Sequence, residues 1–223
     1  MNISYFDGDV ELEGYYIKQG EKLPLVLLCH AWRGRDDFIE EKARHFANLG
    51  YNTFALDMYG KGVLGKSPEE NAALKAPFIK DRLLVKNRVL KGHEKAKAIA
   101  GDVPVAVLGY GLGGLVALDL ARQQVPLKGV ISVYGHFDAP SFGGKIDVPV
   151  LIHQGYLDPV EPIEKLMSFL KTLTHFETVL FGDAYHAFAT PSANNKAAGI
   201  LYNPEAAKAS LDSIASFLKR VFN

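Results

Sequence analysis

Groups that acyl-transfer chemistry requires occur in a fixed order along this chain. A glycine-rich segment, GYGLGG at 109–114, lies where a strand pattern gives way to a helix pattern. Asp158 follows the apolar stretch Val150–Ile152, and His186 comes after a further strand pattern that ends at Phe181. In hydrolases built on a parallel sheet, nucleophile, acid and histidine follow one another in this order. The order predicts that Asp158 orients His186 next to the glycine-rich turn.

The glycine-rich segment has the spacing of a nucleophile elbow, a sharp turn between a strand and a helix. Small residues are needed two positions before and two positions after its apex, because strand and helix pass very close together there. Gly109 and Gly113 occupy these positions, so Gly111 is the apex. The apex residue adopts a positive φ, which glycine does with the least strain. The N–H group of Leu112 would then point from the helix start towards a developing oxyanion.

The same segment also satisfies G-x-G-x-x-G, the fingerprint of dinucleotide-binding domains, through Gly109, Gly111 and Gly114. By itself this motif is a weak signal, because it normally belongs to the first strand–helix–strand unit of a domain. Here several strand patterns precede it, and Asp138, the acid after the next strand, follows a glycine and is poorly placed for a ribose. A nucleotide-binding oxidoreductase is therefore a remote alternative.

The composition is that of a folded protein with a sizeable core. Of 223 residues, 48% are hydrophobic and 22% are charged, which argues against disorder and against a scaffold held by disulfides. Lys and Arg number 25, as do Asp and Glu, so charge gives no reason to expect nucleic acid or a membrane as partner. Cys29 is the single cysteine, and neither a signal peptide nor a membrane-spanning apolar run is visible. We expect a cytoplasmic monomer or homodimer.

Strand and helix patterns alternate along the chain. Strands are expected at Glu11–Lys18, Leu23–Cys29, Tyr51–Asp57, Val103–Leu108, Lys128–Tyr134, Val148–Gly155 and Phe176–Phe181. Helices are expected at Asp37–Leu49, Ala72–Ala100 with a break near Pro77, Leu112–Gln124, Ile163–Leu173 and Glu205–Phe222. This alternation predicts one α/β domain over residues 1–223, with a mostly parallel central sheet and helices on both faces. The functional loops of such sheets lie at the carboxyl ends of the strands.

The chain also resembles the dienelactone hydrolase family of α/β-hydrolases over nearly its whole length. The matching stretches are LVLLCHAWRG at 25–34, GYNTFALDMYGKG at 50–62, VLGYGLGGLVALDLAR at 107–122, HQGYLDPVEP at 153–162 and AYHAF at 184–188. The last three together are quite specific. The resemblance implies an α/β-hydrolase fold and hydrolysis of a small ester or lactone. It implies a cysteine or serine nucleophile with an aspartate and a histidine, and neither a cofactor nor a metal.

The family pattern assigns roles to individual positions. It places the aspartate at Asp158, the histidine at His186, and the two N–H donors of the oxyanion hole on Trp32 and Leu112. The nucleophile position, usually cysteine in G-x-C-x-G-G, is Gly111 here. Because glycine carries no atom that can attack a carbonyl, no acyl-enzyme can form through this position.

Two further positions depart from dienelactone hydrolase itself. Ala31 stands where that enzyme has a glutamate, and Thr190 stands where it has an arginine that helps hold the substrate carboxylate. Both departures argue against a dienelactone as the substrate. The residues expected to line the pocket are His30, Ala31, Tyr110, His136 and Thr190.

Several functions remain open at this point. The first is a hydrolase of small esters or lactones in which Gly111 occupies the nucleophile position. The second is a catalytically impaired pseudoenzyme or small-molecule binding module, and the third is the oxidoreductase. Taken singly, Asp158 would also serve as a helix cap and His186 as a loop residue bonded to backbone. Their order and their places after strands favour the first function.

Overall fold

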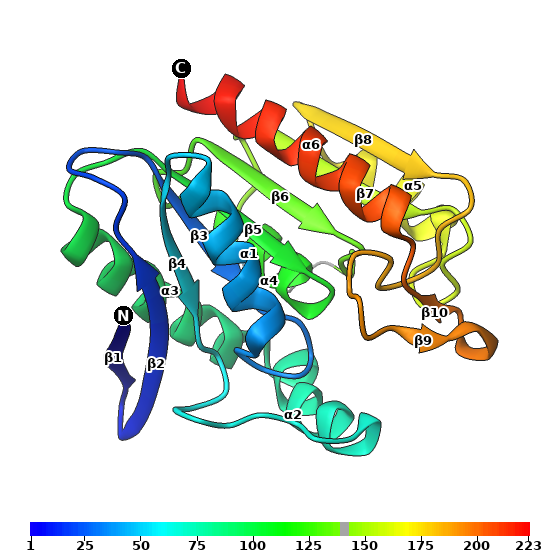
Figure 1. The fold of residues 1–223 in the computed structure, drawn as a ribbon, viewed down its shortest axis with the longest axis horizontal. Helices are drawn as coiled ribbons and strands as arrows, with labels where there is room; N and C mark the ends of the chain where they lie inside the picture. The colour runs from blue at the N-terminus through cyan, green and yellow to red at the C-terminus, as the bar shows by residue number, and fades with distance from the viewer. Residues whose placement is uncertain (139–142) are drawn as a thin grey trace.

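The computed structural model describes residues 1–138 and 143–223. Within these ranges, one sheet has the strand order β1-β2-β4-β3-β5-β6-β7-β8 (Figure 1). Its strands are β1 (Asn2–Asp7), β2 (Val10–Ile17), β3 (Leu25–Cys29), β4 (Asn52–Leu56), β5 (Val105–Tyr110), β6 (Gly129–Val133), β7 (Val150–Gly155) and β8 (Phe176–Phe181). β1 and β2 pair antiparallel, as do β2 and β4, whereas the pairs from β4 to β8 are parallel. The expected mostly parallel sheet is confirmed.

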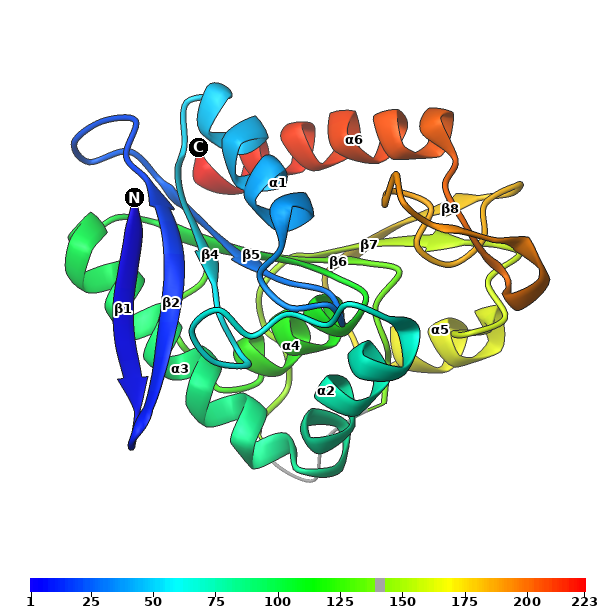
Figure 2. The ribbon, with the colours of Figure 1, turned by 60° about the horizontal axis from the view of Figure 1, so that its bottom comes forward.

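Helices cover both faces of this sheet, as the sequence predicted. They are α1 (Asp37–Asn48), α2 (Pro68–Lys80), α3 (Arg82–Ala100), α4 (Leu112–Ala121), α5 (Ile163–Leu170) and α6 (Pro204–Phe222). Figure 2 shows α1 and α6 on one face, with α3, α4 and α5 on the other. A short hairpin of β9 (Asn194–Asn195) and β10 (Ile200–Leu201) lies between β8 and α6.

The central strands are apolar because both of their faces are buried. Every residue of β3, β4, β5, β6 and β7 is buried. One core packs against α3, α4 and α5 and includes Val89, Leu115 and Phe169. The other packs against α1 and α6 and includes Phe46 and Phe217. Two well-filled layers therefore hold the carboxyl ends of these strands in place, and the candidate site lies at those ends.

The break expected near Pro77 occurs after that residue instead. Helix α2 continues through Pro77, and Asp81 separates it from α3. The backbone N–H of Asp81 donates to the carbonyl of Pro77, while its side chain accepts from the N–H groups of Leu83 and Leu84. Asp81 thus ends one helix and caps the next, and this local hydrogen bonding sets the boundary.

Other boundaries differ by a few residues. Helix α4 ends at Ala121 and α5 at Leu170, earlier than their apolar patterns suggested. β1 and the β9–β10 hairpin were not expected from the sequence, and their side chains are mostly exposed or half-buried. Of the helices in the described ranges, none has both the length and the apolar character needed to cross a membrane.

Candidate active site

The turn between β5 and α4 has the backbone geometry of a nucleophile elbow. Gly111 has φ +55° and ψ −117° and directly precedes the first residue of α4. Its N–H donates to the carbonyl of Val133 over 3.0 Å, which fixes the turn against the end of β6. The expectation of a positive φ at Gly111 is confirmed. The turn is an elbow, and the dinucleotide interpretation of the same glycines is not supported.

The glycines on either side of the apex are required by close approach of the backbone. A Cβ atom on Gly109 would lie 1.8 Å from the carbonyl oxygen of Gly113. A Cβ atom on Gly113 would lie 2.1 Å from the carbonyl oxygen of Cys29. Both distances are far below van der Waals contact, so only glycine fits at either position. The elbow is thereby packed directly against the end of β3.

The apex differs from its neighbours because it has room for a side chain. A Cβ atom on Gly111 would have as its nearest neighbours Ala31 Cβ and the ring atoms Cδ2 and Cε2 of Tyr134, each at 3.9 Å. These are ordinary van der Waals distances. Glycine is therefore not demanded here by packing, and the positive φ is the one feature that favours it.

Asp158 follows β7 and is buried, with its carboxylate bonded on both oxygens. Oδ1 accepts from the N–H groups of Val160 at 2.8 Å and Glu161 at 3.0 Å. Oδ2 accepts from Nε2 of Gln154, also at 2.8 Å. The side chain itself is 0% exposed. Burial with this many donors fixes the carboxylate in one orientation.

His186 completes a hydrogen-bonded pair with Asp158. Its Nδ1 lies 2.8 Å from Asp158 Oδ2, and 13% of the His186 side chain is exposed. The two loops are joined by the N–H of Leu157, which donates to the carbonyl of Ala184. The backbone of His186 pairs with the segment around β10, donating to Gly199. The hydrogen-bonded pair expected from the sequence is confirmed.

The pairing decides which nitrogen of His186 carries the proton. An ionised Asp158 offers acceptors alone, so Nδ1 must donate to it. In the neutral imidazole, Nε2 then presents a lone pair and can take a proton from a nucleophile. This is the tautomer that a general base requires.

Tyr134 lies between the elbow and the histidine and was not expected at the site. Its ring is adjacent to the Cβ position of Gly111 and lies 5.4 Å from the His186 ring, centroid to centroid. Its hydroxyl is hydrogen-bonded to Oγ1 of Thr190 at 3.0 Å. Burial raises the pKa of the Tyr134 phenol, so it stays neutral. The buried Tyr134 ring therefore neighbours both the Cβ position of Gly111 and the imidazole of His186.

The expected donors of an oxyanion hole lie on the two loops beside the elbow. Leu112 begins α4, and the described residues offer no backbone acceptor to its N–H. Trp32 lies in the turn after β3, where Gly34 N–H donates to the carbonyl of Ala31. The carbonyl of Trp32 accepts from the hydroxyl of Tyr59, which holds this turn. Convergence of the two N–H groups stays a prediction.

Two of the expected pocket residues lie in the interior instead of at the surface. His30 is fully buried, and its Nδ1 donates to the carbonyl of Ala31 while its Nε2 accepts from the N–H of Met58. Burial lowers the pKa of His30, in keeping with a neutral structural role. Tyr110 is also fully buried and packs edge-on against Phe38. His30 supports the loop after β3, and Tyr110 the strand below the elbow.

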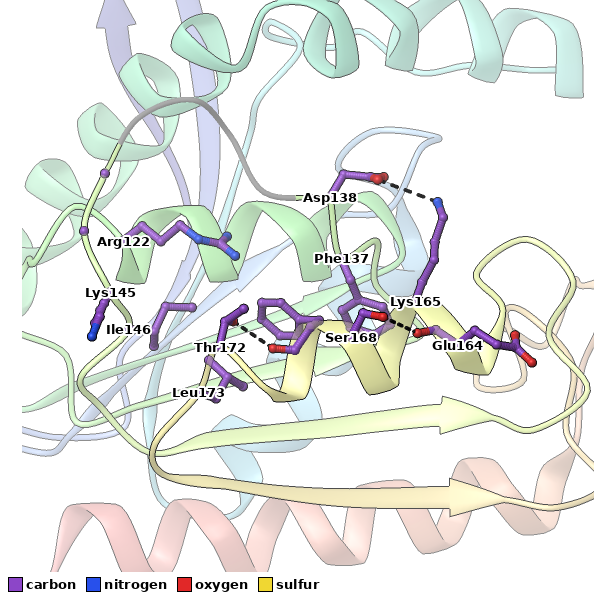
Figure 3. A pocket seen from close by; sticks show the side chains of 13 residues that line it. Arg122, Phe137, Asp138, Lys145, Ile146, Glu164, Lys165, Ser168, Thr172 and Leu173 are labelled. Atoms are coloured by element: carbon purple, nitrogen blue, oxygen red, sulfur yellow. Dashed lines mark hydrogen bonds and ion pairs between the residues drawn. The ribbon is translucent and has the colours of Figure 1, made fainter.

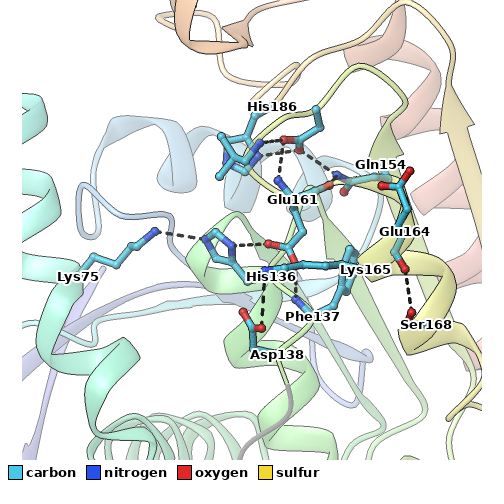
Figure 4. A network of polar contacts seen from close by, with 12 residues as sticks. Lys75, His136, Phe137, Asp138, Gln154, Glu161, Glu164, Lys165, Ser168 and His186 are labelled. Atoms are coloured by element: carbon cyan, nitrogen blue, oxygen red, sulfur yellow. Dashed lines mark hydrogen bonds and ion pairs between the residues drawn. The ribbon is translucent and has the colours of Figure 1, made fainter.

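A second histidine–carboxylate pair lies next to the first (Figure 4). His136 Nδ1 is 3.1 Å from Oε2 of Glu161, and its Nε2 is 3.3 Å from Nζ of Lys75 on α2. Its ring is nearly parallel to that of His186, with centroids 6.1 Å apart. Burial lowers the pKa of the Lys75 ammonium, whereas the negative charge of Glu161 acts to raise it. His136 therefore lies between the ammonium group of Lys75 and the carboxylate of Glu161, next to the His186–Asp158 pair.

Glu161 and Asp158 are joined through the same short turn. Besides the N–H of Glu161 bonded to Asp158, Nε2 of Gln154 donates to both Asp158 Oδ2 and the Glu161 carbonyl. The Glu161 carboxylate accepts from Phe137 N–H and lies 3.6 Å from Nζ of Lys165. Neither Gln154 nor Glu161 was expected at the site from the sequence. The signal was polar residues within and just after an otherwise apolar strand.

Cys29 has no access to the site. It is fully buried in the core at the end of β3, and burial raises the pKa of its thiol. A buried, protonated thiol is a poor nucleophile, so Cys29 does not replace the missing side chain at Gly111.

A cavity of about 860 Å³ lies apart from the elbow, between α5 and the segments on either side of residues 139–142 (Figure 3). Phe137, Ile146 and Phe169 are among its lining residues, with Arg122 and Lys165. None of Gly111, Asp158 and His186 lines it. We assign no role to this cavity.

The parallel sheet, the elbow and the histidine–aspartate pair at its carboxyl edge define an α/β-hydrolase. The model of the dienelactone hydrolase family matches residues 12–222, and the chain belongs to that family. A protein of Saccharolobus solfataricus, provisionally named carboxymethylenebutenolidase, is 27% identical over 91% of each chain.

Solved structures show the same fold. The protein m3DLH superposes with a TM-score of 0.90 at 26% identity, covering 100% of this chain and 98% of its own. A dienelactone hydrolase-like promiscuous phosphotriesterase from metagenomic libraries also gives a TM-score of 0.90, at 24% identity and with the same coverage. The expected family and fold are thus confirmed.

Proposed function

We propose that this chain is a hydrolase of small esters or lactones in which water, activated by His186, replaces the side-chain nucleophile. The observation that carries the proposal is the bonded pair of His186 and Asp158 beside an elbow whose apex, Gly111, has kept its positive φ. The pair supports a role for His186 as a base, and Gly111 contributes no side-chain nucleophile.

In this mechanism, Nε2 of His186 takes a proton from water as the water oxygen attacks the substrate carbonyl. The N–H groups of Leu112 and Trp32 are the donors we assign to the resulting oxyanion. When the tetrahedral intermediate collapses, the protonated His186 returns a proton to the leaving alcohol. No covalent intermediate forms, so hydrolysis should proceed without a burst.

The rate of this reaction should be modest. In serine hydrolases that lack a triad member, the oxyanion hole and binding still give roughly 10³–10⁴ over the uncatalysed rate. Ala31 and the Tyr134 ring lie around the apex, so we expect small, uncharged acyl groups there. Thr190, bonded to Tyr134, offers no charge that would hold a substrate carboxylate.

Restoring the nucleophile tests the proposal. Gly111→Cys should raise esterase activity on p-nitrophenyl acetate well above that of this chain, and Gly111→Ser more weakly. His186 can take the thiol proton, and the thiolate attacks better than water. Burst kinetics and an acyl adduct on the introduced thiol, detected by mass spectrometry, would support the proposal. Gly111→Ala is the matched control, because it adds the Cβ atom without a nucleophile and should show neither.

A binding module is the second candidate, and the glycine at the apex is the observation in its favour. A pocket that holds a small carbonyl compound without turning it over needs no nucleophile. The same variant separates the two candidates. If Gly111→Cys folds normally yet forms no acyl adduct and gains no hydrolytic activity across a panel of small esters and lactones, the binding module would be the better proposal.

A further inference from the structure

The sheet has two edges, and β8 forms the edge that lies beyond β7 (Figure 1). Within residues 1–138 and 143–223, no strand pairs with the outer side of β8. Its pairing with β7 is continuous from Phe176 to Phe181, without a bulge. An edge of this kind presents a row of unpaired N–H and C=O groups to which another strand can bind.

The hydrogen bonds of β8 show which of its backbone groups face outwards. The carbonyl of Phe181 accepts from the N–H of Tyr156, which directly follows β7. Backbone groups of successive residues point to opposite sides of a strand, so alternate residues of β8 face away from β7. These are Phe176, Thr178 and Leu180. Their N–H and C=O groups have no hydrogen-bond partner in the part of the chain that the structure describes.

β8 lacks the features that usually protect an edge strand. Its sequence, FETVLF, contains neither proline nor lysine, and Phe176 and Leu180 are 43% and 44% exposed. Its one charged residue, Glu177, is paired, because both of its carboxylate oxygens lie 2.6 Å from Nη2 of Arg220 on α6. The composition of β8 is therefore that of a strand with a partner on both sides.

The opposite edge of the sheet, β1, differs in this respect. The N–H of Tyr16 donates to the carbonyl of Met1, so the residues of β1 that face away from β2 are Asn2, Ser4 and Phe6. Two of these three are polar, and the Ser4 hydroxyl is bonded to the carboxylate of Glu11. The outward residues of β8 are the more apolar set, which favours β8 as the edge that pairs.

We propose that β8 pairs antiparallel with β8 of a second copy of this chain, about a two-fold axis at Thr178. The sheet then continues from one copy into the other. In this register Thr178 lies opposite Thr178 of the second copy, and Phe176 lies opposite Leu180. All three outward residues form hydrogen-bonded pairs, which gives about six hydrogen bonds between the copies. The exposed phenyl and isobutyl groups cover each other on both sides of the axis.

A second copy fits this edge because the edge is self-complementary. The outward residues are apolar, polar and apolar in either direction along the strand, as an interface with two-fold symmetry requires. On the other face of β8, Glu177 lies opposite Val179 of the second copy, so the two Glu177–Arg220 pairs are diagonal neighbours across the axis. Each carboxylate already has its guanidinium, and the axis therefore brings no unpaired like charges together.

Self-association of the full chain is the first test. Sedimentation velocity should show two species, one with the mass of a single chain and one with twice that mass, whose ratio shifts with protein concentration. The midpoint of thermal unfolding should rise with concentration, because dimerisation stabilises the folded chain alone. A single species with the mass of one chain at every concentration would overturn the inference.

Two variants of β8 and one of β1 test where the copies meet. Leu180→Lys should weaken the dimer by roughly 10²-fold or more, because each dimer would bury two unpaired charges. Thr178→Pro should also weaken it, since the lost N–H faces outwards and the bonds to β7 stay intact. Phe6→Lys, at an exposed position of the other edge, is the matched control and should leave the dimer unchanged. Circular dichroism checks folding. A dimer that survives Leu180→Lys, or is lost in Phe6→Lys, would contradict the proposed interface.

A cysteine at the axis tests the register. Opposite residues of a hydrogen-bonded pair have Cα atoms about 5.5 Å apart, which is within the range of a disulfide. Mild oxidation should therefore link Thr178→Cys into a covalent dimer. Phe176→Cys should not link to itself, because the two copies of that position would lie about 13 Å apart along the strands. The natural cysteine, Cys29, is buried. Equal linking at both positions, or none at Thr178→Cys, would contradict the register.

This inference does not depend on the proposed function, and the two fail separately. Self-association is measured without turnover, and β8 contributes neither Gly111 nor the His186–Asp158 pair. A dimer through β8 combined with an inactive Gly111→Cys would remove the hydrolase proposal and leave the interface. A chain that stays monomeric while Gly111→Cys forms an acyl adduct would do the reverse.

Discussion

Nδ1 of His186 lies 2.8 Å from Oδ2 of Asp158, although 28 positions separate the two residues in the sequence. Each follows a different parallel strand, and their loops are bonded to each other where Leu157 N–H meets the Ala184 carbonyl. The pair therefore depends on the registry of β7 and β8. Its chemical consequence is a neutral imidazole with Nε2 available as a base.

The first prediction concerns that tautomer. In the Gly111→Cys background, Asp158→Asn should lower kcat by on the order of 10³–10⁴, because an amide N–H opposite Nδ1 places the imidazole proton on Nε2. KM should change little, since Asp158 is buried and does not contact substrate. Steady-state kinetics against pH would check this, and an unchanged kcat would show that Asp158 only caps the turn to Val160 and Glu161.

The second prediction concerns the packing of the elbow. Gly109→Ala and Gly113→Ala should each cost about 3 kcal/mol or more of unfolding free energy, because their Cβ atoms would overlap backbone. Gly111→Ala should cost about 1–3 kcal/mol, from its positive φ alone. Urea denaturation of the three variants measures the difference. Equal losses at all three positions would mean that close packing does not fix the turn.

The third prediction concerns the dependence of stability on pH. His153 on β7 is buried, with its ring nitrogens bonded to the hydroxyls of Ser210 and Ser213, and burial lowers its pKa to about 4. The unfolded chain binds this proton near pH ~6.5 and the folded chain does not, so the unfolding free energy falls as pH drops from about 6.5 towards 4. The full contribution of His153 is about 3 kcal/mol.

The control for this effect is His153→Gln, which does not titrate. Its unfolding free energy, measured by urea denaturation at steps between about pH 7 and 4, should fall less steeply than that of the unaltered chain. Comparing the two removes the contributions of other buried histidines, such as His30 and His93, whose pKa values burial also lowers. Parallel curves would rule out His153 as the source.

The fourth prediction separates the ring of Tyr134 from its hydroxyl. Tyr134→Phe removes the hydrogen bond to Thr190, which should cost about 1 kcal/mol of stability, and it leaves the ring against His186 and the apex. Activity of Gly111→Cys should therefore survive Tyr134→Phe and fall sharply in Tyr134→Ala. Thr190→Val is the matched control for the hydroxyl. A large loss of kcat in Tyr134→Phe would assign the hydroxyl a direct role instead.

Most of the sheet could be predicted because buried parallel strands are apolar on both faces. The stretches that form β3 and β5 are continuous apolar runs for that reason. β1 was missed because it is an edge strand, largely exposed, whose sequence NISYFD carries no continuous apolar signal. The boundary between α2 and α3 was expected at Pro77, but Pro77 lies inside α2. The boundary falls at Asp81, because the Asp81 side chain caps the start of α3.

By itself, the sequence determined the elbow and the order of its chemical groups. Spacing alone identified Gly109 and Gly113 as the close-packed positions, Gly111 as the apex, and Asp158 and His186 as the groups that follow. These features can be recognised locally, because the spacing of the glycines is a short sequence pattern and the groups follow one another along the chain in the order of the strands.

The tertiary structure alone decided what surrounds that apex. The Tyr134 ring lies beside both Gly111 and His186. The Gln154 side chain donates to Asp158 and to the backbone carbonyl of Glu161. His30 is buried in the interior. No local pattern encodes these contacts, because each depends on how parallel strands align and on where their loops then meet. For the same reason, only the folded chain shows that the apex glycine has room beside it.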